Sequence, residues 1–183
     1  MVTVQVTAVK NGKSVDTSMG FTPSSDLPMG TRIGDLDPGV ACYLMQVEKL
    51  TPEQFSHLIN HESGLPGVSE ISSDMRKLLK CQATDSRAAE AIELFCYQTK
   101  KWICSFAALP GGLNTLVFSG GIGEHAPEVG DRICRGLEFL GIELEEARNV
   151  KNETIIFTDV SKVCVHVIKI NEELMIAGLV CKF

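Results

Sequence analysis

Residues 116–126 (LVFSGGIGEHA) constrain the fold of this chain most strongly. An apolar run ends in Gly120 and Gly121, Gly123 follows one residue later, and Pro127 opens a helix-start signal. The pattern predicts a buried strand, a glycine turn and then a helix. Glycines let a ligand approach the backbone because they carry no Cβ atom, and a helix start offers free N–H groups. The segment therefore predicts a site for a nucleotide.

The same glycines also fit two other interpretations. From Gly121 the letters read G-x-G-x-x-A, and Glu143 follows at about the spacing of the Rossmann dinucleotide fingerprint. A Rossmann unit usually opens its domain, however, whereas several predicted helices precede this one. A tight turn that needs a positive φ and binds nothing is the other alternative.

Size and charge limit the classes of partner. The 183 residues are enough for one domain with its own core. The formal net charge of −6, with no long basic run, argues against nucleic acid as a partner. No apolar segment reaches the length of a transmembrane helix, and residues 1–12 lack the layout of a signal peptide. We therefore expect no membrane partner and a cytoplasmic location.

Cysteine usage agrees with that compartment. The seven cysteines are odd in number and irregularly spaced, with no C-x-x-C pair, which indicates reduced packing residues. The four histidines show no spacing typical of zinc ligands either.

The elements follow from turn, cap and periodicity signals. A hairpin is expected over residues 2–9 and 13–19, then a long loop over 20–38 that is rich in Gly, Pro, Ser and Asp. Helices are expected over 39–49, 52–61, from 73 or 74 to 79, 85–109 and 127–140, and a polar loop over 62–73. Strands are expected over 115–119 and 163–170, with a terminal helix from residue 171. This order predicts an α/β domain in which helices pack on a mixed sheet.

The long loop carries a single arginine. Residues 29–38 (MGTRIGDLDP) place Arg32 between glycines and beside Asp35 and Asp37. The planar guanidinium suits a phosphate or a carboxylate. An ion pair with one of the two aspartates is the alternative.

Residues 74–76 form a second polar group after a glycine-containing stretch. Arg76 has two possible roles, because its side chain can stack on a base or pair with Asp74. A purely solvated surface role is the simpler interpretation of this group.

A third polar group follows the last predicted strand. A carboxylate from Glu172 or Glu173 at that place faces the edge of the sheet where α/β folds bind ligands. Carboxylate oxygens suit Mg²⁺. Alternatively Asn171 caps the terminal helix and the glutamates only complement its dipole.

Taken together these motifs resemble the acetate kinase family, which includes propionate and butyrate kinases. The resemblance is carried by collinear segments between about residues 6 and 177. They are SVDTSMGFTP (14–23), MGTRIGDLDP (29–38), SGLPGVSEISSDMRKL (63–78), FSGGIGEHAPEVGDRICRGLEFLGIEL (118–144) and INEELMIA (170–177).

The resemblance implies an RNase H-like lobe of the actin, Hsp70 and sugar-kinase superfamily. Family enzymes are about twice as long, so residues 1–183 look like a single C-terminal, nucleotide-binding lobe without its N-terminal lobe. Arg32 would contact the transferring phosphoryl group, and Glu172 would be associated with Mg²⁺. The implied nucleotide-binding residues are Asp74, Met75, Arg76, Gly120, Gly121, Ile122, Gly123 and His125.

The chain departs from the family pattern at three places. The family's HLGNG motif is absent where residues 1–5 read MVTVQ, and His125 stands where an asparagine is usual. The tail at residues 178–183 (GLVCKF) also differs.

The activity implied by the resemblance is reversible phosphoryl transfer from ATP to acetate, giving ADP and acetyl phosphate, with Mg²⁺. The expected substrate is acetate or another short-chain carboxylate, and a homodimer through this lobe is expected. An inactive fragment that binds nucleotide or dimerises is the alternative, since a catalytic aspartate and a second arginine belong to the other lobe. A Rossmann oxidoreductase is the remaining class.

Overall fold

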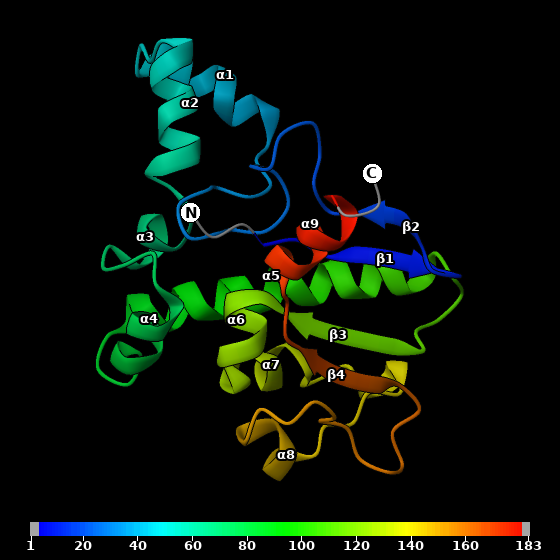
Figure 1. Cartoon of the computed structure of the whole chain (residues 1–183). Helices are drawn as coiled ribbons and strands as arrows, with labels where there is room; N and C mark the ends of the chain where they lie inside the picture. The colour runs from blue at the N-terminus through cyan, green and yellow to red at the C-terminus, as the bar shows by residue number, and fades with distance from the viewer. Residues whose placement is uncertain (1–3, 181–183) are drawn as a thin grey trace. The chain divides into compact units, whose positions relative to one another are not determined.

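The computed structural model describes residues 4–180, except for the side chains of Glu172, Ile176 and Leu179. The chain divides into two compact units, Met1–Gly112 and Leu113–Phe183, and each is described by itself (Figure 1). Both contain helices and one two-stranded sheet, which confirms the α/β class.

The first unit begins with the predicted hairpin. β1 (Thr7–Lys10) pairs antiparallel with β2 (Lys13–Thr17) across Asn11 and Gly12. Both turn residues have positive φ angles, 53° and 73°, which suits a tight two-residue hairpin turn. The strands are shorter than predicted, and the long loop up to residue 37 contains no helix or strand.

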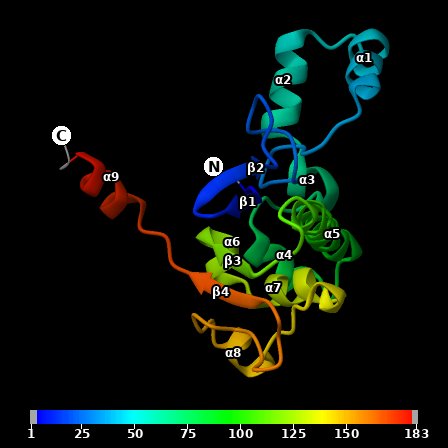
Figure 2. The ribbon, with the colours of Figure 1, turned by 90° about the vertical axis from the view of Figure 1, so that its right-hand side faces the viewer.

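Two helices follow the loop, close to the predicted bounds. Asp37 caps α1 (Pro38–Val47), accepting a hydrogen bond from the N–H of Gly39. Thr51 and Gln54 form a capping box at the start of α2 (Pro52–His61). Neither helix has a buried residue, and both views show them side by side at the end of this unit away from α5 (Figures 1 and 2).

The core of the first unit forms around α5 (Ser86–Ala108), whose N-cap is Asp85 as predicted. α3 (Gly64–Ser69) and α4 (Met75–Cys81) pack against it, and β1 contacts it as well. The α5 residues that are fully or nearly fully buried are Ala88, Ala91, Ile92, Phe95, Cys96, Thr99, Ile103, Phe106 and Ala107.

The prediction of a loop over 62–73 was wrong, because α3 lies within it. The polar residues of this stretch and its two glycines, Gly64 and Gly67, suggested a loop, since glycine disfavours a helix interior. Packing outweighs that preference here: Leu65 is 2% exposed and α3 lies against α5.

The second unit is built on two parallel strands. β3 (Thr115–Ser119) pairs with β4 (Cys164–Ile168) from Thr115↔Cys164 to Ser119↔Ile168, so both carboxyl ends lie at one edge. α6 (Gly120–His125) leaves β3 directly, and α7 (Pro127–Cys134) follows. α8 (Glu146–Val150) packs on α7, and α9 (Glu172–Val180) ends the described chain.

Three details of this unit differ from the sequence-based expectations. The glycine turn is the start of a short helix, and among its glycines only Gly120 has a positive φ, 73°. The helix expected over 127–140 ends at Cys134, because Arg135 has a non-helical ψ of 123°; Gly136 with φ 85° follows, before a 3₁₀ turn. α8 was not predicted at all.

Within residues 4–180 no helix is both long and apolar enough to cross a membrane. None of the six cysteines of that range is part of a disulfide, and two of them, Cys96 and Cys134, are buried. Cys181 lies outside the described residues.

Candidate functional site

The predicted glycine segment lines an open pocket of about 410 Å³ at the carboxyl edge of the parallel strands. This is the edge at which open α/β sheets bind ligands, because loops there diverge from neighbouring strands. The lining residues come from the segment after β3 and from the segment after β4. They are Gly120, Gly121, Glu124, His125, Ile170, Asn171 and Glu173.

Two glycines leave the pocket side of the backbone open. A Cβ atom added at Gly121 would meet no atom within 4 Å, and one at Gly120 would meet only Ile170 Cδ1, at 3.8 Å. A ligand can therefore reach the backbone there. Gly123 has the opposite role, since its added Cβ would lie 3.1 Å from the carbonyl carbon of Phe118. That glycine lets α6 pack closely on the end of β3.

The other predicted residues of α6 complete this part of the site. The Ile122 carbonyl accepts a hydrogen bond from the N–H of Ala126 at 3.0 Å, which closes the last turn. His125 is exposed, and its Nδ1 lies 3.1 Å from the carbonyl oxygen of Gly121. The imidazole thus stands on the pocket rim beside the open glycine.

The segment after β4 supplies polar oxygens to the same pocket. Asn171 Oδ1 accepts from the N–H of Leu174 at 2.9 Å, which confirms its capping role at α9. Glu173 is exposed and lines the pocket. The side chain of Glu172, the predicted magnesium-associated residue, lies outside the described part of the structure.

Arg32 lies in the first unit, on a tight turn of the long loop. The N–H of Met29 donates to the Arg32 carbonyl at 3.0 Å, and Arg32 Nη1 donates to the Pro23 carbonyl at 3.1 Å. The turn is anchored to the helices behind it, because the N–H of Leu65 donates to the Met29 carbonyl at 2.9 Å. The backbone of Arg32 is thus fixed by the turn, and its guanidinium contacts the earlier part of the same loop at Pro23.

Asp74 and Arg76 form the predicted pair. Arg76 donates to Asp74 Oδ1 from Nε at 3.1 Å and to Oδ2 from Nη2 at 2.8 Å, a two-point ion pair. This contact with Arg76 lowers the pKa of Asp74 below its usual value. Asp74 also caps α4, while Met75 is only 4% exposed and belongs to the core.

Within the first unit these two groups are neighbours. A Cβ atom added at Gly30, in the Arg32 turn, would lie 3.5 Å from the carbonyl oxygen of Ser73. The backbone of the Arg32 turn therefore passes directly beside the residue that precedes Asp74. Residues 120–125 and 171–173 come together separately, in the second unit.

Sequence reasoning missed Glu124. Its carboxylate oxygen Oε1 accepts from the backbone N–H groups of Gly120 and Ile170, at 2.8 and 2.9 Å. Glu124 lies four residues after Gly120, a spacing that brings a side chain back to that residue in a helix. The sequence predicted a turn at this position, so the spacing gave no signal.

Among the residues described, no group of three or more His, Cys, Asp and Glu side chains is placed to hold a metal ion.

Comparisons with known proteins place the chain in a family. Residues 3–178 match the acetokinase family. The chain is 49% identical over 175 residues to an acetate kinase of Dictyoglomus thermophilum, covering 94% of this chain and 44% of that protein. It is 47% identical over 173 residues to a propionate kinase of Salmonella typhimurium, covering 94% and 43%.

Solved structures give the same answer. The crystal structure of Porphyromonas gingivalis acetate kinase matches with a TM-score of 0.93 at 40% identity, covering 97% of this chain and 46% of that one. The acetate kinase of Entamoeba histolytica matches with a TM-score of 0.92 at 34% identity, covering 98% and 48%. The chain therefore spans less than half the length of these relatives, and it belongs to the acetokinase family.

Proposed function

We propose that this chain is the nucleotide-binding half of an ATP-dependent phosphotransferase that acts on acetate or another short-chain carboxylate. The observation that carries the proposal is the open glycine pocket at the carboxyl edge of β3 and β4, in a chain of the acetokinase family. The relatives named acetate kinase and propionate kinase support the substrate class.

In this proposal the nucleotide lies over the backbone of Gly120–Gly123. Its base and ribose contact Asp74, Met75 and Arg76. The two-point pair with Asp74 supports that role, because it holds the exposed Arg76 guanidinium flat and in one orientation. Met75, being buried, would contribute through its backbone and by fixing the start of α4.

Arg32 would contact the phosphoryl group while it is transferred. Phosphoryl transfer depends mainly on positioning and on neutralising charge that spreads over the transferring oxygens. A guanidinium that donates to the Pro23 carbonyl, on a backbone turn closed by the Met29–Arg32 hydrogen bond, loses little freedom when it binds an anion. Its planar fork also matches a phosphoryl or carboxylate group.

Mg²⁺ fits the oxygen chemistry of the second unit. Magnesium is usually held by one or two carboxylates together with substrate phosphates, and here it would neutralise phosphate charge. Glu173 supplies a carboxylate at the pocket, and Glu172, predicted from the sequence, precedes it in the chain. A cytoplasmic location, where ATP is present, belongs to the same proposal.

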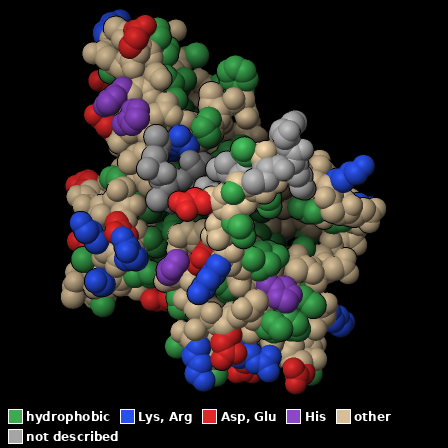
Figure 3. Space-filling view, in the orientation of Figure 1, with side chains coloured by type: hydrophobic (Ala, Val, Ile, Leu, Met, Phe, Trp, Pro, Cys, Tyr) green, Lys and Arg blue, Asp and Glu red, His purple; other side chains and the backbone are tan. Residues whose placement is uncertain are grey.

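We also infer that the partner is a second copy of this chain. α1 carries three exposed apolar residues, Val40, Tyr43 and Val47, which are 41%, 57% and 53% exposed. Their spacing of three and four places them on one face of the helix. Hydrophobic side chains appear over α1 and α2 in the space-filling view (Figure 3). An apolar stripe of this kind is typical of an interface between proteins.

The test fills the pocket without disturbing the fold. Gly121→Leu adds a side chain into space where no atom lies within 4 Å, so we expect an unchanged melting temperature. The same side chain should block the nucleotide and weaken Mg·ADP binding at least about tenfold, measured by calorimetry.

Gly130→Ala is the matched control. It changes another helical glycine of the second unit, whose added Cβ would lie 3.7 Å from Asn149 Oδ1, and it should leave Mg·ADP affinity unchanged. Equal Mg·ADP affinity in the wild-type chain and in Gly121→Leu would contradict the proposal. A chain that binds Mg·ADP but forms no acetyl phosphate would be the nucleotide-binding module alone.

A further inference from the structure

Glu124 is a lining residue of the glycine pocket that none of the roles above uses. It is the fifth residue of α6. A single oxygen, Oε1, accepts from the N–H of Gly120 at 2.8 Å and from the N–H of Ile170 at 2.9 Å. These two donors belong to the two chain segments that form the pocket.

The position of these donors explains why a side chain is needed. The β3–β4 ladder ends at the pair Ser119↔Ile168, so Gly120 and Ile170 lie just beyond the last strand pair. The hydrogen bond between Glu124 and Ile170 joins residues 46 positions apart. It therefore continues the connection between the two segments past the end of the sheet.

The hydrogen bond from the Ile170 N–H is the main reason why the carboxyl group of Glu124 favours its ionised form. The Ile170 N–H, and then the Gly120 N–H, His125 and Lys169, lower the pKa of Glu124 below its usual value, against a partial loss of hydration. An ionised acceptor makes shorter and stronger hydrogen bonds than a neutral one. The ionised carboxylate of Glu124 therefore holds the Gly120 and Ile170 N–H groups more strongly than the protonated carboxyl group would.

The close fit of α6 against β3 brings the carboxylate to this place. The Gly123 Cα carries no Cβ, and an added one would lie 3.1 Å from the Phe118 carbonyl carbon. α6 can therefore start directly at Gly120, which lets the i+4 side chain reach back to the Gly120 N–H.

We propose that Glu124 is a positioning residue, whose carboxylate ties the segment after β3 to the segment after β4 and so sets the shape of the nucleotide pocket. The effect on nucleotide binding rests on the proposed function. The link between the two backbone segments does not depend on that function.

The first test measures the backbone alone. In ¹⁵N–¹H spectra of the full chain, the Gly120 and Ile170 amide protons should both shift upfield in Glu124→Gln and in Glu124→Ala. In the wild-type chain both signals should move together on acidification, with one pKa below that of an ordinary glutamate, and neither should titrate in Glu124→Gln. Unchanged signals, or a change at Gly120 only, would overturn the proposal.

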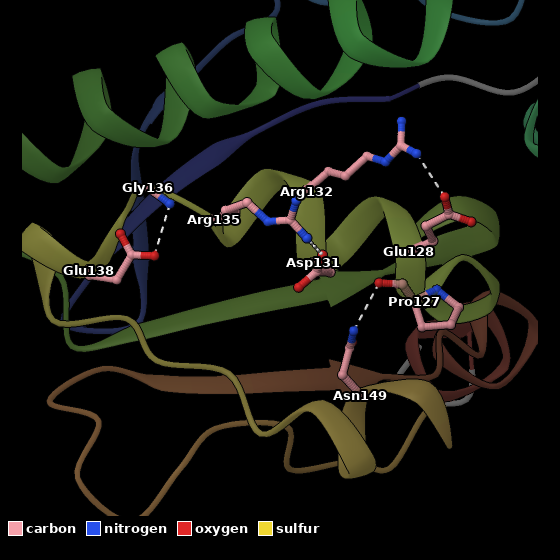
Figure 4. Close-up of polar contacts among 8 residues, drawn as sticks. All are labelled: Pro127, Glu128, Asp131, Arg132, Arg135, Gly136, Glu138 and Asn149. Carbon is pink, nitrogen blue, oxygen red and sulfur yellow. Dashed lines mark hydrogen bonds and ion pairs between the residues drawn. The ribbon is translucent and has the colours of Figure 1, made fainter. Parts of the chain in front are cut away.

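Glu138→Gln is the matched control. The Glu138 carboxylate accepts from the Gly136 N–H at 3.0 Å, within one turn after α7 (Figure 4). Glu138 does not line the glycine pocket. It should leave the Gly120 and Ile170 signals in place.

The second test measures Mg·ADP binding by calorimetry. We expect Glu124→Gln to weaken binding about tenfold with an unchanged melting temperature, and Glu138→Gln to have no effect. Equal Mg·ADP affinity in Glu124→Gln and in the wild-type chain would show that Glu124 does not shape the nucleotide pocket. If the wild-type chain does not bind Mg·ADP at all, the proposed function fails while the amide shifts still decide the link between the segments.

Discussion

Asp26 is a carboxyl group buried in the loop that carries Arg32. It is fully buried, its φ is +89°, and the Ser18 hydroxyl donates to its Oδ2. Burial raises the pKa of Asp26 from 3.8 to about 6, opposed by the Ser18 hydrogen bond and assisted by the nearby Asp35 carboxylate. The folded protein therefore holds a proton that the unfolded chain releases at lower pH.

The raised pKa of Asp26 makes the stability of the fold depend on pH. Asp26 favours folding most below about pH 4, and this contribution is lost as the pH rises through about 6. Above about pH 6, ionised Asp26 lowers the free energy of unfolding by about 3 kcal/mol relative to its protonated form. Asp26→Asn should therefore be more stable than the wild-type chain at pH 8, with a smaller advantage at pH 5. Urea unfolding followed by the fluorescence of Trp102, the only tryptophan and part of the same unit, measures this.

Asp16→Asn is the control, because Asp16 is an exposed aspartate of β2. Its effect should be small and equal at both pH values. The same advantage for Asp26→Asn at pH 5 and pH 8 would show that burial does not shift the titration of Asp26.

Gly64 is the residue that lets α3 begin beside the Arg32 turn. Its φ is +65°, and an added Cβ would collide with the carbonyl oxygens of Met29 and Arg32. Backbone atoms on both sides cannot move aside. Gly64→Ala should therefore lower the free energy of unfolding by roughly 2–4 kcal/mol.

Gly67→Ala tests whether position rather than residue type matters. Gly67 lies in the same helix, and its added Cβ would meet only the Glu62 carbonyl oxygen, at 3.7 Å. This change should be neutral or slightly stabilising, because alanine favours a helix. Equal losses in the two variants, measured by urea unfolding, would contradict the role given to Gly64.

At the scale of elements, the helix starts could be predicted from the sequence, because they depend on nearby capping residues. Asp37, Thr51, Asp74 and Asp85 were readable helix starts because each caps its helix with its own side chain. α3 could not be predicted in this way, since its stability comes from contacts with α5 that are distant in sequence.

The candidate site shows the same division. The exposed glycine backbone and the Asp74–Arg76 pair could be inferred from residue types, but the link from Glu124 to Ile170 depends on which strands pair.

The apolar stripe of α1 gives the element-scale prediction. Tyr43→Glu places a charge in the stripe of Val40, Tyr43 and Val47, so it should weaken self-association at least about tenfold. The fold should be unaffected, because α1 has no buried residue. Cys42→Glu puts the same charge on an exposed position outside the stripe and should change little. Sedimentation measures both, and a wild-type chain that is monomeric at high concentration would contradict the stripe's role.

At the scale of the whole molecule, the chain consists of two compact units, each with its own group of predicted site residues. Arg32 and Asp74–Arg76 belong to Met1–Gly112, whereas the glycine pocket belongs to Leu113–Phe183. The chain covers 44% of one acetate kinase relative and 43% of a propionate kinase.

The most direct measurement is a map of amide signals in ¹⁵N–¹H spectra as Mg·ADP is added to the chain. We expect saturable shifts at Gly120, Gly121 and His125 in the second unit, and at Asp74 and Arg76 in the first. These shifts should be absent from Gly121→Leu. Saturable shifts confined to other residues, or no shifts at millimolar Mg·ADP, would contradict a nucleotide site at the glycine pocket.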